Sequence, residues 1–321
     1  MSAVRFGLIS NPRSERNKRG MHQIRSHAAK YPDLLHIELD AGCTLQRALE
    51  EMARAGVELL VCNSGDGMVQ GVMTLMLEQR MFGELPDLAI LPRGMANMTA
   101  ADCGLTGRRW RDLQRLLDAA RAGRLAGHRL RRHVLRVDYR DDRPAQRGMF
   151  MGALGIYDAI RICTGTVHKH GLKGEWSHAA TLAGLLLGSL FRGLDAFGID
   201  GHDIRLRIDQ GELLDERLLL LLCTTLDRLV LRSRPFWNDQ GGPVRFTRIG
   251  HPPVGLLRNA GRVLYGGEPR RLPETDYRSC GARQVELWLD EPFTIDGEFF
   301  EPLRTRPVRI SAYDTLDLVR I

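Results

Sequence analysis

A single carboxylate, Asp66, lies between two glycines in the stretch VCNSGDGMVQGVM at residues 61–73. The apolar residues before it are typical of a buried strand, and the apolar residues after it recur at helical spacing. In parallel α/β sheets, ligands bind beyond the carboxyl ends of the strands, where glycines let the backbone approach a phosphate and the next helix offers free N–H groups. A lone acid there would repel phosphate, so we expect Asp66 to hold Mg²⁺ or to accept a proton from a hydroxyl that attacks a γ-phosphate.

The same loop also permits a purely structural interpretation. Gly-Asp-Gly suits the geometry of an ordinary turn, so the loop alone leaves both interpretations open. A Walker A phosphate loop is excluded, because the chain contains no G-x-x-x-x-G-K-[ST] pattern.

The elements around this loop alternate between strand and helix over the first 130 residues, which predicts a parallel sheet with helices on both sides. The strands are expected at residues 4–10, 34–40, 57–62 and 88–91, and the helices at 44–56, after the glycine loop, and at 110–123. Beyond residue 130 the apolar residues mostly alternate with polar ones, and only residues 168–193 have helical spacing. We therefore predict an α/β domain at 1–130 and an antiparallel, β-rich domain at 131–321.

Composition limits the classes of partner and the compartment. The chain has 321 residues and a formal net charge of +7, which favours anionic partners such as nucleotide phosphates or an acidic membrane surface. It lacks the interleaved basic and aromatic pattern of RNA-binding modules, so we expect no nucleic acid partner. Its six cysteines include no C-x-x-C pair, and Cys62 and Cys223 lie in apolar runs, which predicts a reducing compartment without a zinc site.

Two apolar segments bear on localisation. The N-terminal MSAVRFGLISNP has the pattern of a first strand followed by a turn, unlike a signal peptide. The most apolar run, at residues 179–191, is shorter than the roughly 20 residues that span a bilayer. We expect a cytoplasmic protein with at most peripheral membrane contact.

Four motifs together resemble those of one family. They are NPRS at residues 11–14, SGDG at 64–67, LPRGMANMTAADCGL at 91–105 and IDGE at 295–298. In this order they resemble the diacylglycerol kinase catalytic family, which includes the sphingosine and ceramide kinases. The resemblance implies a nucleotide-binding α/β domain followed by a β-sandwich domain, ATP and Mg²⁺ as cofactors, and a lipid hydroxyl as the phosphate acceptor.

The resemblance also assigns roles to individual residues. It makes Asp66 the essential catalytic and metal-binding acid, and Glu298 a second acid that reaches from the second domain into a cleft between the domains. It places Asp158 near the lipid headgroup. Asp102 could replace the acid that usually follows Asn97. The nucleotide-binding positions that it implies are Asn11, Pro12, Arg13, Ser14, Ser64, Gly65, Gly67, Gly94, Asn97 and, near ATP, Lys173 together with Lys169.

Departures from the family pattern keep alternatives open. Ser64 is similar to sphingosine kinases and Met68 to ceramide kinases, which favours a ceramide or sphingoid acceptor over diacylglycerol. Met95 and Met98 stand where the family has threonine and often aspartate, which would suit a catalytically impaired nucleotide- or lipid-binding protein of the same fold. A NAD kinase-like enzyme shares the glycine loop but matches the other motifs less well. The partners we expect are a lipid substrate, an anionic membrane and a second copy in a homodimer.

Overall fold

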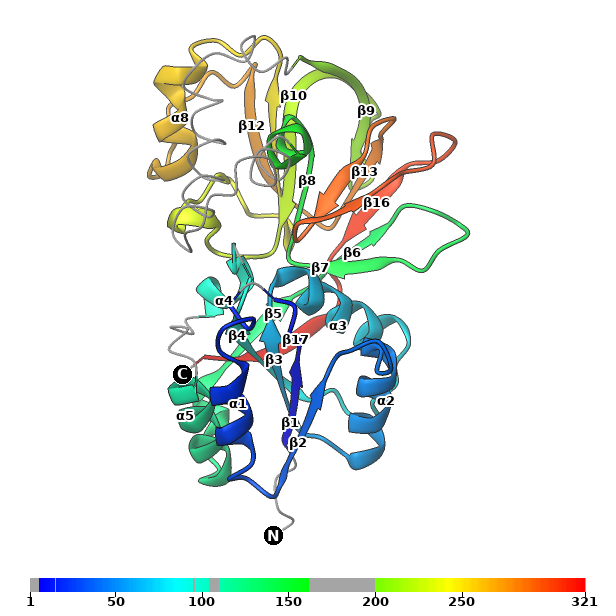
Figure 1. Ribbon diagram of the computed structural model, residues 1–321. Helices are drawn as coiled ribbons and strands as arrows, with labels where there is room; N and C mark the ends of the chain where they lie inside the picture. The colour runs from blue at the N-terminus through cyan, green and yellow to red at the C-terminus, as the bar shows by residue number, and fades with distance from the viewer. Residues whose placement is uncertain (1–5, 15, 95, 104–109, 162–199, 321) are drawn as a thin grey trace. The chain divides into compact units, whose positions relative to one another are not determined.

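The computed structural model describes residues 6–14, 16–94, 96–103, 110–161 and 200–320 (Figure 1). The chain divides into two compact units. The first contains residues 1–132 together with 314–321, and the second contains residues 133–313.

The first unit is built on a six-stranded sheet with the strand order β2-β1-β3-β4-β17-β5. The pairings among β1 to β4, and between β4 and β17, are parallel. The strands are β1 (Phe6–Ser10), β2 (Leu34–Glu38), β3 (Leu59–Ser64), β4 (Asp87–Pro92), β5 (Arg129–His133) and β17 (Thr315–Val319). The helices are α1 (Met21–Ala28), α2 (Leu45–Ala55), α3 (Asp66–Glu78), α4 (Met98–Cys103) and α5 (Trp110–Arg121), with a short 3₁₀ helix at Leu125–His128.

Helices cover both faces of this sheet, as the alternation of elements predicts (Figure 1). Phe6 and Leu8 of β1 belong to one apolar core with the buried side of α1 and α5. Gly7 points the other way, where an added Cβ would lie 2.8 Å from the sulfur of Met52 on α2. Successive residues of β1 thus pack against opposite helix layers, the pattern of a doubly wound sheet. The parallel α/β fold of the N-terminal region is confirmed.

The strand order places a topological switch point between β1 and β3. The chain passes from β1 to β2 on one side and then to β3 on the other side of β1. The register pairs Ser10 with Asn63, so the loops that follow these two strands leave the sheet side by side. A switch point at the carboxyl ends of parallel strands is where this class of sheet binds its ligands.

The C-terminal strand β17 lies in the first unit, although the sequence analysis assigned all of residues 131–321 to the second domain. Leu318 of β17 pairs with Leu88 of β4. Apolar alternation identifies a strand but carries no information about a partner so distant in the chain, which is why the sequence did not place this strand.

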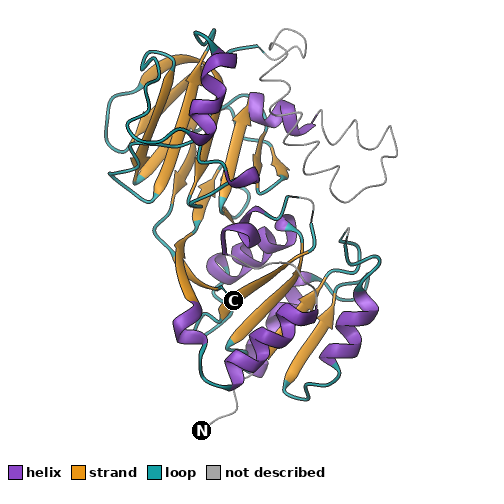
Figure 2. Ribbon diagram, turned by 90° about the vertical axis from the view of Figure 1, so that its left-hand side faces the viewer, coloured by secondary structure: helices purple, strands orange, loops and turns teal. Residues whose placement is uncertain are grey.

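The second unit is dominated by one antiparallel sheet of 11 strands (Figure 2). Its long central strand β10 (Leu214–Thr224) pairs with β8 (Phe150–Leu154), β9 (His202–Ile208) and β11 (Val244–Gly250). A register shift between Leu218 and Leu220 marks where the pairing of β10 with β11 becomes irregular. Its strands enclose one apolar core, and the predicted β-rich second region is confirmed. The other strands are β6 (Leu135–Asp138), β7 (Gln146–Gly148), β12 (Tyr277–Ala282), β13 (Gln284–Trp288), β14 (Phe293–Ile295), β15 (Glu298–Phe300) and β16 (Val308–Ser311).

The prediction that residues 168–193 are the only helical segment of this unit was wrong. Residues 168–193 themselves lie outside the described residues. Two other segments are helical: α8 (Leu256–Tyr265) and residues 155–161. Among the described residues, no helix has the length and apolar character needed to cross a membrane.

Candidate active site

The loops after β1 and β3 are joined by direct hydrogen bonds at the switch point. The backbone N–H of Asn11 donates to the carbonyl of Asn63 at 3.2 Å. The hydroxyls of Ser14 and Ser64 lie 2.9 Å apart, which links the NPRS and SGDG motifs side chain to side chain. The fold therefore brings together two of the motifs that the sequence analysis singled out.

A buried amide that the sequence analysis missed fixes both loops. Asn17 is 1% exposed, and its Nδ2 donates to the carbonyls of Asn11 and Asn63, each at 2.8 Å. Two hydrogen bonds to backbone carbonyls hold the loops at a defined separation. No sequence signal marks Asn17, because an asparagine in a polar, basic loop is usually solvated.

Two glycines of neighbouring loops lie backbone against backbone. A Cβ built on Gly94 would lie 2.6 Å from the Cα of Gly65, and one built on Gly65 would lie 2.8 Å from the Cα of Gly94. Any side chain at either position would push the two loops apart. Gly65 is also the residue that precedes α3, so this contact positions the N-terminus of that helix.

The turn at residues 94–97 supplies a backbone donor to the central acid. The side chain of Asn97 accepts from the N–H of Gly94 at 2.8 Å and donates to its carbonyl at 2.7 Å, while Asn97 itself has φ +50°. The next residue, Met98, donates its N–H to Oδ2 of Asp66 at 3.3 Å. Asn97 therefore shapes this turn, and Met98 contacts Asp66 through its backbone, whatever its side chain.

Asp66 is the first residue of α3, and its carboxyl has an unusual pKa. Desolvation raises the pKa of Asp66 to about 6, and hydrogen bonds from the backbone of Met98, Asn97 and Thr99 only partly offset this. A carboxyl that titrates near neutral pH can be ionised at physiological pH and still accept a proton, which suits a general base.

A network of buried polar side chains lies at the strand ends beneath these loops. Arg93, which is 3% exposed, donates from Nε to Oδ1 of Asn63 at 3.0 Å. Asn63 donates from Nδ2 to the hydroxyl of Ser10 at 2.9 Å, and Ser10 hydrogen-bonds Nε2 of His36 at the same distance. Burial lowers the pKa of His36. The network joins β1, β2 and β3 to the residue that follows β4, so it fixes the strand ends from which the loops leave.

The residues present suit a nucleotide triphosphate with a divalent cation. The N-terminus of α3, which the contact between Gly65 and Gly94 positions, presents free N–H groups and the positive end of the helix dipole to an anion. The loop after β1 adds cations at Arg13, Arg16, Lys18 and Arg19. No group of three or more potential metal ligands occurs among the described residues, but Mg²⁺ commonly binds one carboxylate together with substrate phosphates, a role open to Asp66.

Of four other predicted residues, two have defined positions and two lie outside the described residues. Oδ2 of Asp102 accepts from Nε and Nη2 of Arg132, at 3.1 and 2.9 Å, and is therefore held in an ion pair. Asp158 forms a weaker pair with Arg161 at 3.4 Å. Lys169 and Lys173 lie outside the described residues.

In the second unit, Glu298 begins strand β15 beside a tightly held turn. Asp296 accepts at Oδ2 from the N–H of Met149 at 2.9 Å and at Oδ1 from the N–H of Phe150 at 3.0 Å. Gly297 adopts φ +93°, a conformation that favours glycine. The Asp and Gly of the DGE motif thus form the turn, and they leave the Glu298 side chain exposed.

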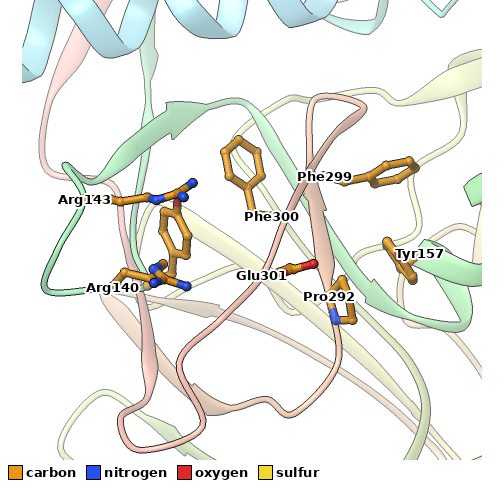
Figure 3. Close-up of a pocket in the computed structure, with 8 residues that line it drawn as sticks. Arg140, Arg143, Tyr157, Pro292, Phe299, Phe300 and Glu301 are labelled. Atoms are coloured by element: carbon orange, nitrogen blue, oxygen red, sulfur yellow. The ribbon is translucent and has the colours of Figure 1, made fainter.

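A pocket of about 280 Å³ opens next to this hairpin (Figure 3). Phe299 and Tyr157 lie on one side of it, and Arg140 and Arg143 lie on the other, with Phe300 between them. The rings of Phe299 and Tyr157 meet edge to face at 5.1 Å, although Phe299 is 44% exposed. The pocket is lined by Tyr139, Arg140, Arg143, Tyr157, Pro292, Phe299, Phe300 and Glu301. Sequence reasoning did not identify it, because its residues come from three separate segments.

Comparison with known proteins gives matches in sequence and in fold. Residues 5–126 match the family described as the diacylglycerol kinase catalytic domain. Over 124 residues the chain is 32% identical to the probable lipid kinase YegS of Salmonella arizonae. The match spans 39% of this chain and 36% of that relative, so it covers only about a third of the relative's length.

Solved structures match over the whole chain. A putative diacylglycerol kinase from Bacillus anthracis superposes with a TM-score of 0.66 at 17% identity, covering 100% of this chain and 98% of that one. Another diacylglycerol kinase from the same organism gives 0.63 at 15% identity, with the same coverage. Yeast NADH kinase gives 0.51 at 10% identity, covering 100% of this chain and 84% of that one. Because these identities are low, the superpositions establish the fold alone. The matched segment contains the three motifs that meet at the switch point, so this part of the chain is similar to the diacylglycerol kinase catalytic domain.

Proposed function

We propose that the protein is an ATP-dependent lipid kinase. One observation carries the proposal: Asp66, with a pKa of about 6, lies on the first turn of α3 where the NPRS, SGDG and Gly94–Asn97 loops meet. Catalysis of phosphoryl transfer rests mainly on positioning and on stabilisation of charge, which these loops suit. The match of residues 5–126 to the diacylglycerol kinase catalytic domain supports the same activity.

In the proposed reaction, the hydroxyl oxygen of the acceptor forms a bond to the γ-phosphorus while the bond from that phosphorus to the β,γ-bridging oxygen breaks. The hydroxyl proton passes to Asp66, and ADP leaves with the electron pair of the broken bond. Bound Mg²⁺ would neutralise charge on the phosphates and would be held chiefly by their oxygens, which leaves the carboxyl of Asp66 to take the proton. Backbone N–H groups at the start of α3 and the cation of Arg13 would stabilise the transferring group.

The pocket beside Glu298 supports an amphipathic acceptor. Its aromatic wall suits acyl or sphingoid carbons, and its arginines suit a polar headgroup. The exposed Phe299 immediately follows Glu298, so an acceptor held there would lie next to that acid. That Glu298 and Asp158 contact the acceptor remains a prediction.

We further propose that ceramide or a sphingoid base is preferred over diacylglycerol. This preference rests on the resemblance at Ser64 and Met68. Ser64 is 2% exposed, and its hydroxyl faces Ser14, so we assign it a role in joining the loops.

The acceptor is tested by incubating the protein with labelled ATP and Mg²⁺ in mixed micelles that contain ceramide, sphingosine or diacylglycerol, with NAD as a soluble acceptor. Labelled ceramide or sphingosine would support the proposed preference. Labelled diacylglycerol alone would keep the lipid kinase and remove the preference. Labelled NAD with unlabelled lipids would overturn the lipid kinase in favour of a NAD kinase-like enzyme.

We expect Phe299→Ser to raise the KM for the lipid about tenfold, because it removes an aromatic surface on which the acceptor packs. The KM for ATP should remain unchanged. The control is Tyr313→Ser, which removes another aromatic side chain that is 65% exposed. Equal lipid KM values for the two variants would contradict a role of the pocket in binding the acceptor.

A further inference from the structure

One helix of the second unit buries one side and leaves two large apolar side chains exposed on the other. Leu256 and Val263 of α8 pack into a cluster with Tyr277. On the outer side, Leu257 is 48% exposed and Tyr265 is 54% exposed, and Val254, just before the helix, is 58% exposed. Residues 257, 261 and 265 share one helical stripe, and at Gly261 an added Cβ would have no neighbour within 4 Å. Among the residues that the structure describes, nothing covers the stripe at Gly261.

A strained loop adjoins the end of this helix and presents another exposed leucine. Leu231 and Arg232 are consecutive non-glycine residues with φ +57° and +59°, and Leu231 is 52% exposed. The loop closes on itself through the N–H of Leu229, which donates to the carbonyl of Ser233 at 2.8 Å. The following N–H, of Arg234, donates to the carbonyl of Leu264 in α8 at 2.8 Å. Strain of this kind persists where the surrounding structure imposes it, and it is concentrated at functional sites.

The loop and the helix segment carry positively charged side chains and no acidic ones. Residues 228–238 and 251–267 contain no aspartate or glutamate. Their arginines are Arg228, Arg232, Arg234, Arg258 and Arg262. We call these two segments the α8 surface. Exposed apolar side chains interspersed with cations complement a surface that is anionic outside and apolar just below, as an acidic lipid bilayer is.

We propose that the α8 surface docks on an anionic membrane, with Leu231, Val254, Leu257 and Tyr265 entering the interfacial layer and the arginines contacting lipid phosphates. The proposal rests on the proposed function only in that a lipid kinase must reach a membrane-bound acceptor. The same surface chemistry could instead serve as an interface between copies of this chain, and the test separates the two.

The test is sedimentation of the full-length protein with phosphatidylcholine vesicles that contain roughly 30% of the anionic lipid phosphatidylglycerol, because basic residues are attracted to an anionic surface. We expect Leu257→Ser with Tyr265→Ser, and separately Arg258→Glu, to weaken binding about tenfold. Leu213→Ser, at a leucine that is 41% exposed on the β9–β10 turn, is the matched control and should bind as the wild type does. Pure phosphatidylcholine vesicles should bind the wild type about tenfold more weakly.

Activity toward a short-chain acceptor in detergent micelles separates this proposal from the proposed function. Unchanged micellar activity with weakened vesicle binding supports docking by the α8 surface. Weakened vesicle binding in a protein without any kinase activity supports docking but overturns the kinase. Equal vesicle binding by the wild type and the α8 variants overturns the docking proposal. The docking proposal is also overturned if the wild type is a dimer and the Leu257→Ser, Tyr265→Ser double variant is a monomer that still binds vesicles as the wild type does.

Discussion

Asp66→Asn is expected to lower kcat for phosphate transfer about a thousandfold while leaving the affinity for ATP within a few-fold of the wild type. The amide keeps the shape of the side chain and an oxygen for the N–H of Met98, which the carboxylate binds at 3.3 Å. It cannot accept the hydroxyl proton or neutralise a metal ion. Initial rates with labelled ATP, together with calorimetric titration of the nucleotide, measure the two effects separately.

The control for this substitution is Glu78→Gln, at the other end of α3, which should leave the rate unchanged. Stability provides a second check, because the pKa of Asp66 is raised to about 6 in the folded protein. A raised acid pKa means that the carboxyl favours the folded state only while protonated, and this contribution is lost as pH rises through about 6. Asp66→Asn should therefore be at least as stable as the wild type at pH 8, so unfolding would not explain its lost activity. A variant that keeps more than about a tenth of the wild-type rate would contradict the assignment.

Gly94→Ala is expected to lower kcat/KM for ATP about a hundredfold, since the new methyl would lie 2.6 Å from the Cα of Gly65. The backbone must shift, and the shift moves both the start of α3 and the turn that gives Asp66 its hydrogen bond. Gly83→Ala is the matched control, because nothing lies within 4 Å of a Cβ at that glycine of the same unit. Melting temperatures of the two variants show how much of the effect is loss of fold. If both alanine variants bind ATP equally, the contact between the glycines has no part in nucleotide binding.

Much of the first unit followed from its sequence because its signals are local. The Gly stop after the helix at residues 44–56 is confirmed, with Gly56 at φ +67°. Alternating strands and helices gave the parallel sheet, and the position of Asp66 after a buried strand located the edge where the loops meet. Local periodicity suffices for such elements, since each forms from neighbouring residues.

The features that the sequence did not reveal depend on contacts between distant segments. Asn17 acts by joining the carbonyl of Asn11 in its own loop to that of Asn63 at the end of β3, and β17 is placed by its pairing with β4. The helix α8 lies among strand-like segments and is only ten residues long, so its apolar spacing was overlooked. In the sequence, Met98 stands where the resembled family often has aspartate. In the structure, the backbone N–H of Met98 donates to Asp66, a contact that does not depend on the side chain.

The measurement that tests the central claim most directly is the pH dependence of kcat/KM for the wild-type protein with its lipid acceptor, from pH 5 to pH 8.5. If transfer depends on the ionised carboxyl of Asp66, log kcat/KM should rise with a slope of one and level off above an apparent pKa of about 6. A profile that is flat down to pH 5 would mean that transfer does not depend on this carboxyl, and the assignment of Asp66 as the proton acceptor would be wrong.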